Sequence, residues 1–149
     1  MGKLCVLVLL LVMFNSCKKE VVDYSQIDED IITQYIVDNN LTAIATGTGL
    51  YYVIDTPGNG AQPNSQSSVT VAYKGYLTNG SVFDESTIAG VSFSLTSVIQ
   101  GWQEGIPYFK EGGSGILLIP SALGYGSQPT SGIPANSVLV FEVELIDVL

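Results

Sequence analysis

The stretch VTVAYKGYLTNGSVFDES, residues 69–86, indicates the fold more clearly than any other part of this 149-residue chain. From Val69 to Thr78 its side chains alternate in the manner of a β-strand, with Val69, Val71 and Tyr73 on one face. Asn79-Gly80 then favours a two-residue hairpin turn, because that pair accepts positive φ. A second strand is expected over 81–84. The stretch therefore predicts an antiparallel hairpin.

The flanking segments extend this β pattern. Further strands are expected over 50–54, 91–95, 114–119 and 138–148, of which the last is the clearest because apolar residues alternate there with Glu142 and Glu144. One helix is expected over 98–109, with Trp102 on its apolar face and Pro107 ending it early. These elements predict an α+β fold in which an antiparallel sheet of about five strands is crossed by one short helix.

The first residues have the pattern of a signal peptide. Lys3 is followed by an apolar run over 4–14, which is too short to span a bilayer core as a helix. Cleavage after Ser16 would leave Cys17 at the new N-terminus. This segment resembles a bacterial lipoprotein signal, although Phe14 and Asn15 depart from the usual pattern. Residues 1–16 are therefore expected to be the signal peptide and Cys17 the lipid-attachment residue. An ordinary secretory signal that is cut nearby is the alternative.

Residues 17–49 are expected to form a lipid-anchored spacer that contains a helix. Ser25 can cap this helix, and Asn39-Asn40 can end it. Its isoleucine and tyrosine residues recur at helical spacing. We expect this stripe to pack on the main domain, formed by residues 50–149, while a dimerisation helix is the alternative. The stripe consists of Ile27, Ile31, Ile32, Tyr35 and Ile36.

Composition narrows the range of functions. The net charge is −9, with five lysines and no arginine, which argues against a nucleic-acid partner. The chain has no histidine, so it lacks the usual general base and the usual zinc ligand. We expect no metal and no cofactor. Cys5 would leave with the signal and Cys17 would be acylated, so no disulfide is expected.

Five phrases, in this order, resemble the isomerase domain of the FK506-binding proteins. The resemblance covers roughly residues 50–149, and five ordered matches are far more specific than a single motif. The phrases are VAYKGYL at 71–77, NGSVFDES at 79–86, VIQGW at 98–102, LGYG at 123–126 and LVFEVEL at 139–145.

This resemblance implies a fold, a site and a reaction. The fold would be a twisted antiparallel sheet wrapped around a short helix, with an apolar hollow between them. The reaction would be peptidyl-prolyl cis-trans isomerisation during the folding of exported proteins, and macrolides of the FK506 type would be expected ligands. The backbone N–H of Ile99 would be a further donor to a substrate carbonyl. The catalytic set would be Tyr73, Asp84, Tyr125 and Phe141, and the substrate-binding set Phe83, Phe93, Val98, Ile99, Trp102 and Ile133.

Two features depart from the family pattern. No basic residue lies between Phe83 and Phe93, where many relatives have an arginine, so Asp84 needs another hydrogen-bond partner, with Tyr73 as the candidate. The loop over 126–132, which would overhang the hollow, also varies among relatives. Substrate preference is therefore hardest to predict at this loop.

Alternative functions follow from the same residues. The fold could serve as a non-catalytic chaperone or binding module on the cell envelope, or as a structural surface lipoprotein whose apolar residues are all core. A hydrolytic site is disfavoured, because Asp84 and Glu85 are neighbours on a strand and point apart. The lipoprotein resemblance implies a cell-envelope position, and Lys18 after the cysteine favours the outer membrane.

Overall fold

The computed structural model describes residues 22–149. The expected signal segment and the lipid-attachment residue Cys17 lie outside this part. Within the described residues, no helix has both the length and the apolar character needed to cross a membrane.

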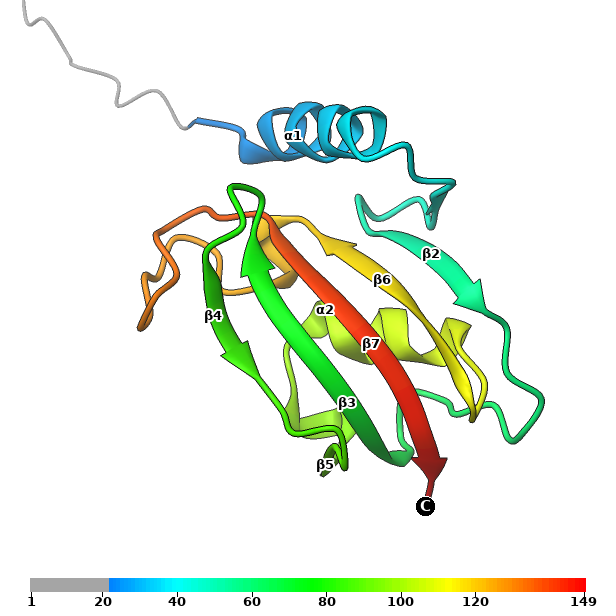
Figure 1. Ribbon diagram of the computed structural model, residues 1–149. Coiled ribbons are helices and arrows are strands. Elements are labelled where there is room, and N and C mark those ends of the chain that lie inside the picture. Colours follow the sequence, from blue (N-terminus) through cyan, green and yellow to red (C-terminus); the bar gives the residue numbers. More distant parts are fainter. Residues whose placement is uncertain (1–21) are drawn as a thin grey trace, which may run out of the picture.

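An antiparallel sheet of seven strands forms the body of the protein (Figure 1). The sequence predicted about five strands, and its six candidate ranges correspond to β2–β7, so among the described residues only the two-residue edge strand β1 was not anticipated. The sheet has the order β1-β2-β6-β7-β3-β4, with β5 paired to β3. The strands are β1 (Ile44–Ala45), β2 (Tyr51–Thr56), β3 (Ser68–Leu77), β4 (Val82–Glu85), β5 (Val91–Ser94), β6 (Gly113–Ile119) and β7 (Leu139–Val148).

Strand β3 organises the side of the sheet where the hollow lies. Along one edge it pairs with β7 over most of its length, from Val69 opposite Val148 to Leu77 opposite Leu139. Its other edge is shared, because β5 pairs with its first half and β4 with its second half. Register shifts accompany these pairings near Val71 and Gly75, and such bulges bend a strand. Strands β4 and β5 can therefore follow different directions around the hollow.

The β3–β4 turn differs from the predicted two-residue hairpin. The backbone N–H of Leu77 donates to the carbonyl of Ser81, and that of Gly80 donates to Leu77, so the loop has three residues. Only Gly80 has a positive φ, of 88°, whereas Asn79 does not. A turn followed by a left-handed glycine is the usual form of a three-residue hairpin loop. The asparagine amide accounts for the difference, because Asn79 accepts the N–H of Ser81 through its side chain instead.

Helix α2 (Gln100–Gly105) crosses one face of the sheet and is shorter than predicted. Val98 and Ile99 precede it, and a 3-10 turn over Ile106–Tyr108 follows it. Pro107 lies in this turn, which confirms the expected early end of the helix. Trp102 and Ile106 pack with the inner-face residues of β3, β6 and β7 in the main hydrophobic core.

Helix α1 (Tyr24–Asp38) lies over the opposite face of the sheet, at one end (Figure 1). Its N-cap is Asp23, which accepts the N–H of Ser25, so the predicted cap at Ser25 was wrong by two residues. The helix ends at Asp38 with Asn39 as its C-cap, and Asn40 adopts a φ of 52°, in agreement with the predicted stop at Asn39-Asn40.

The packed side of α1 also differs from the predicted stripe. Ile32 is fully buried in a second core with Leu118, Val138 and Val140, which confirms that α1 packs on the main domain. Ile27 and Ile31, however, are about two-fifths exposed, at 41% and 37%. Asp28, one helical turn before Ile32, takes the buried position instead.

Candidate functional site

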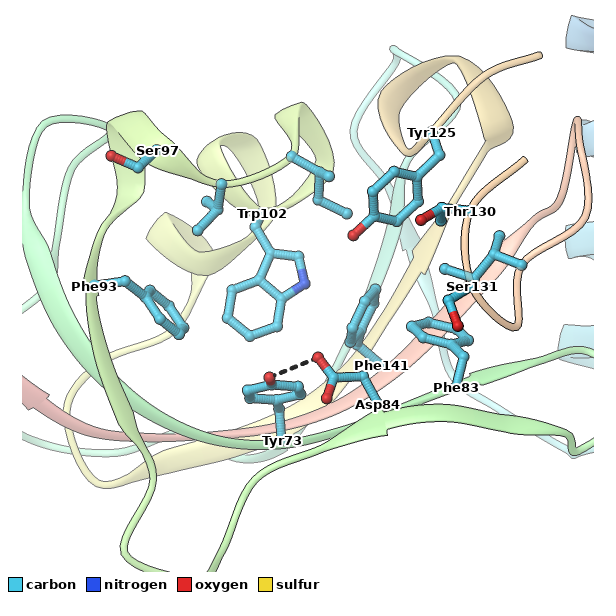
Figure 2. A pocket seen from close by; sticks show the side chains of 13 residues that line it. Tyr73, Phe83, Asp84, Phe93, Ser97, Trp102, Tyr125, Thr130, Ser131 and Phe141 are labelled. Carbon is cyan, nitrogen blue, oxygen red and sulfur yellow. Dashed lines mark hydrogen bonds between the residues drawn. The ribbon is translucent and has the colours of Figure 1, made fainter. Parts of the chain in front are cut away.

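An aromatic hollow of about 490 Å³ lies between the sheet and α2 (Figure 2). All ten residues that the sequence assigned to the site line this hollow. They come from β3, β4, β5, β7, the α2 region and the 125–133 loop, so residues up to 68 positions apart in the chain meet here. The full lining is Tyr73, Phe83, Asp84, Phe93, Ser97, Val98, Ile99, Trp102, Tyr125, Thr130, Ser131, Ile133 and Phe141.

Trp102 lies at the centre of the aromatic wall. Its ring makes edge-on contacts with Tyr73, Phe93 and Phe141, at centroid distances of 5.2, 5.3 and 5.3 Å. Offset and edge-on contacts are the arrangements that aromatic quadrupoles favour. The indole nitrogen is buried and has no hydrogen-bond partner within residues 22–149.

Asp84 is held by Tyr73, as the sequence suggested. The Tyr73 hydroxyl donates to Oδ2 of Asp84 at 2.8 Å, and this is the dashed contact in Figure 2. Among the described residues no lysine is in hydrogen-bond or ion-pair contact with Asp84. The bulged β3–β4 pairing sets Asp84 opposite Gly75, two residues beyond Tyr73, which allows the two side chains to meet. The phenol thus takes the place of the missing basic partner.

Two polar groups lie at the rim of the hollow. Tyr125 is 42% exposed, in keeping with its position between two glycines, and its hydroxyl is turned toward the hollow in Figure 2. Ile99 caps α2, and within the described chain its backbone N–H has no recorded partner. Both groups are available to a carbonyl oxygen in the hollow.

A family model for FKBP-type peptidyl-prolyl cis-trans isomerases matches residues 59–146, which is more than half of the chain. The chain belongs to this family. The FkpA isomerase of Buchnera aphidicola from Acyrthosiphon pisum is 46% identical over 106 residues, covering 70% of this chain and 44% of that protein. FkpA of Escherichia coli K12 is 47% identical over 105 residues, covering 69% of this chain and 39% of the relative. The chain thus spans less than half the length of these curated relatives.

Solved structures of FKBP-type proteins share this fold. The crystal structure of FkpA from Escherichia coli aligns with a TM-score of 0.74 at 38% identity, over 85% of this chain and 61% of that one. A peptidyl-prolyl cis-trans isomerase from Pseudomonas syringae aligns with a TM-score of 0.71 at 30% identity, over 86% of this chain and 98% of the other. The α+β fold with an N-terminal helix is therefore confirmed.

Three hydroxyl residues of the lining were missed by sequence reasoning. Ser97 directly precedes the predicted Val98-Ile99 pair, so its sequence position could have suggested it. Thr130 and Ser131 belong to the loop that was expected to overhang the FKBP hollow, and a backbone bridge between Thr130 and Ile133 turns this loop back on itself. Small hydroxyl residues in a polar loop carry no periodic signal. Their position depends on the fold of the loop.

The burial of Tyr73, together with its hydrogen bond to Asp84, makes the stability of the protein depend on pH. Burial raises the pKa of Tyr73 to about 12, and the hydrogen bond to Asp84 adds to this shift. An unfolded tyrosine titrates near 10. Because the folded pKa is the higher one, the contribution of Tyr73 to stability is complete below about pH 10 and is lost as the pH rises toward about 12.

We therefore expect the stability difference between wild type and Tyr73→Phe to stay constant from pH 6 to 9 and to shrink above about pH 10. Thermal unfolding of both proteins across this range measures the difference. A difference that changes between pH 6 and 9 would show that another group controls the contact.

Proposed function

We propose that this chain catalyses cis-trans isomerisation of X-Pro peptide bonds in exported polypeptides. The observation that carries the proposal is the aromatic hollow, which has Tyr73–Asp84 and Tyr125 among its polar members, within a chain of the FKBP-type family. The reaction needs no bond to be made and no proton to be transferred. A site without a nucleophile–base pair therefore fits it.

The physical basis is differential solvation of the peptide bond. A planar peptide bond is stabilised by resonance, and rotation about it has a barrier of about 18–20 kcal/mol. The twisted state has less charge separation across C–N than the planar state. A hollow walled by Phe83, Phe93, Trp102 and Phe141 therefore disfavours the planar ground state more than the twisted one. The Tyr125 hydroxyl and the Ile99 N–H can orient the preceding carbonyl.

Loss of the Tyr73 hydroxyl should weaken this catalyst. In Tyr73→Phe the Asp84 carboxylate loses its recorded side-chain donor, and a hydrogen bond to a charged group contributes about 1.5–3 kcal/mol. If about 1.4 kcal/mol of this is lost in the transition state, kcat/KM falls about tenfold. The measurement is the cis-trans exchange rate of a proline-containing peptide, followed by NMR or by a protease-coupled assay.

Tyr52→Phe is the matched control for this variant. Tyr52 stacks on Tyr108 with a centroid distance of 4.3 Å and does not line the hollow. Its hydroxyl has no recorded hydrogen bond within residues 22–149, so kcat/KM should be unchanged. Equal losses in the two variants would argue against the assigned role of Tyr73.

A second function is favoured by one observation. Asp84 has a neutral partner instead of the basic residue that many relatives carry, so the hollow could bind proline-bearing segments without turning them over. A macrolide of the FK506 type should bind the hollow in either case. Binding accompanied by a catalysed exchange rate supports the enzyme, whereas binding without catalysis supports a chaperone or adaptor.

The proposed cellular position is the bacterial envelope, through a lipid on Cys17. The short apolar run over 4–14 and the Ser16-Cys17 sequence support this assignment. Lys18 favours the outer membrane. Cys17→Ser should move the protein from the membrane fraction to the soluble fraction, and mass spectrometry of the wild-type N-terminus should find acyl chains. A wild-type protein without acyl chains would overturn the assignment.

A further inference from the structure

Asp28 is a buried acid on α1, outside the segment that matches the family model. Its side chain is 1% exposed and lies on the side of α1 that faces the domain. A carboxylate at such a position is costly to bury unless strong hydrogen bonds compensate. The contacts of Asp28 therefore show what holds it there.

Ser121 supplies both recorded hydrogen bonds. Its backbone N–H donates to Asp28 Oδ2 at 2.8 Å, and its hydroxyl donates to the same oxygen at 2.6 Å. Ser121 is itself 2% exposed and begins the 3-10 turn Ser121–Leu123. The other carboxylate oxygen, Oδ1, has no partner within residues 22–149. Asp28, which precedes the domain in the chain, thus holds the backbone of the domain at Ser121.

The carbonyl of Ser121 continues this connection toward the hollow. It accepts the backbone N–H of Gly124 at 3.0 Å and that of Gly126 at 2.8 Å. These two glycines flank Tyr125, whose side chain lines the hollow. Gly126 has a φ of 58°, and apart from the bond to Ser121 its backbone is held by the N–H of Asn136, which donates to the Gly126 carbonyl at 2.8 Å. Ser121 is therefore a main attachment of the turn that carries Tyr125.

We propose that Asp28 is a positioning residue for the isomerase site, which acts through Ser121 to hold Tyr125 at the rim of the hollow. The inference rests on the proposed function, because it concerns the same site. If Asp28 has this role, α1 contributes to the geometry of the site as well as packing on the sheet. The 3-10 turn Ser121–Leu123 directly follows the C-terminal end of β6. Figure 1 shows α1 lying over this same end of the sheet.

The test compares Asp28→Ala with Asp28→Asn in the purified full chain. Alanine removes both acceptor contacts, so kcat/KM for a proline-containing peptide should fall about fivefold to tenfold. Asparagine keeps one oxygen that can accept from both Ser121 donors, so it should restore most of the rate. In a Tyr125→Phe background the Asp28→Ala change should have little further effect, because the group it positions is already absent.

Ile32→Ala is the matched control, since it removes a fully buried α1 side chain that packs with Leu118, Val138 and Val140 and has no atom that can accept a hydrogen bond from Ser121. It should lower the melting temperature at least as much as Asp28→Ala but leave kcat/KM unchanged. Equal kinetic losses in both variants, or no loss in Asp28→Ala, would overturn the proposal.

Amide hydrogen exchange separates this proposal from the proposed function. The N–H groups of Gly124 and Gly126 should exchange at least about tenfold faster in Asp28→Ala than in wild type, and no faster in Ile32→Ala. This measurement needs no turnover. An inactive wild-type protein with faster exchange would overturn the function and keep the positioning role, whereas unchanged exchange would overturn the positioning role alone.

Discussion

Phe141→Leu is expected to lower kcat/KM for a proline-containing peptide by at least about tenfold. Phe141 is 5% exposed, and its ring lies 5.5 Å from that of Phe83 and 5.3 Å from that of Trp102. Its removal takes an aromatic face out of the hollow and frees its neighbours to move. Each edge-on aromatic pair contributes about 0.5–1.5 kcal/mol beyond its buried area. The loss of two pairs loosens the packing that shapes the hollow, and a tenfold fall corresponds to about 1.4 kcal/mol of transition-state stabilisation lost with it.

The control for this change is Phe109→Leu. Phe109 is 1% exposed and belongs to the same hydrophobic core, but it does not line the hollow. Both variants should lose stability in urea or thermal unfolding, because each removes buried aromatic volume. Only Phe141→Leu should also lose turnover and macrolide affinity. Loss of turnover in proportion to stability in both variants would contradict the assigned role of Phe141.

Gly75→Ala is expected to narrow the hollow, because the added methyl group pushes against two aromatic rings that line it. Gly75 pairs with both Asp84 and Phe141 in the sheet, and an added Cβ would lie 2.6 Å from the ring of Phe83 and 2.7 Å from that of Phe141. Real Cβ atoms do not approach carbon so closely, so the rings must shift. Overpacking of this kind costs about 1–3 kcal/mol. Macrolide affinity, measured by calorimetry, should fall at least about tenfold.

Gly105→Ala provides an overpacked control away from the hollow. Its added Cβ would lie 2.7 Å from a methyl group of Leu117, in the same core. The protein should lose some stability and keep its macrolide affinity. If Gly75→Ala bound the macrolide as tightly as wild type, the hollow would not be the ligand site.

Much of the fold could be read from side-chain periodicity. The alternation along β7 and along β3 predicts a buried face for each strand, and this face is observed to be buried, although Val140 on the other face of β7 is also buried in the second core. The ordered phrases around Asp84 and Tyr125 then identified the residues of the hollow before any geometry was known. Local patterns were sufficient to predict this part of the fold, because the strands that carry the site follow the regular alternation of buried and exposed side chains.

The errors arose where long-range contacts override local preference. Nothing in the sequence singles out Asp28 as a buried residue, because its partner Ser121 is 93 positions away and has no sequence signal. Asn79 forms its turn through its side chain instead of through positive φ. Thr130 and Ser131 reach the hollow only because the loop turns back on itself. Tertiary hydrogen bonds decide each of these positions.

The most direct test of the account is the catalysed exchange rate of a proline-containing peptide, measured with a form of the chain that begins at Lys18 and so retains every described residue. We predict exchange well above the uncatalysed rate, which is suppressed when an FK506-type macrolide fills the hollow. An exchange rate equal to that of the peptide alone, in a folded protein that binds the macrolide, would contradict the isomerase activity and leave a binding module.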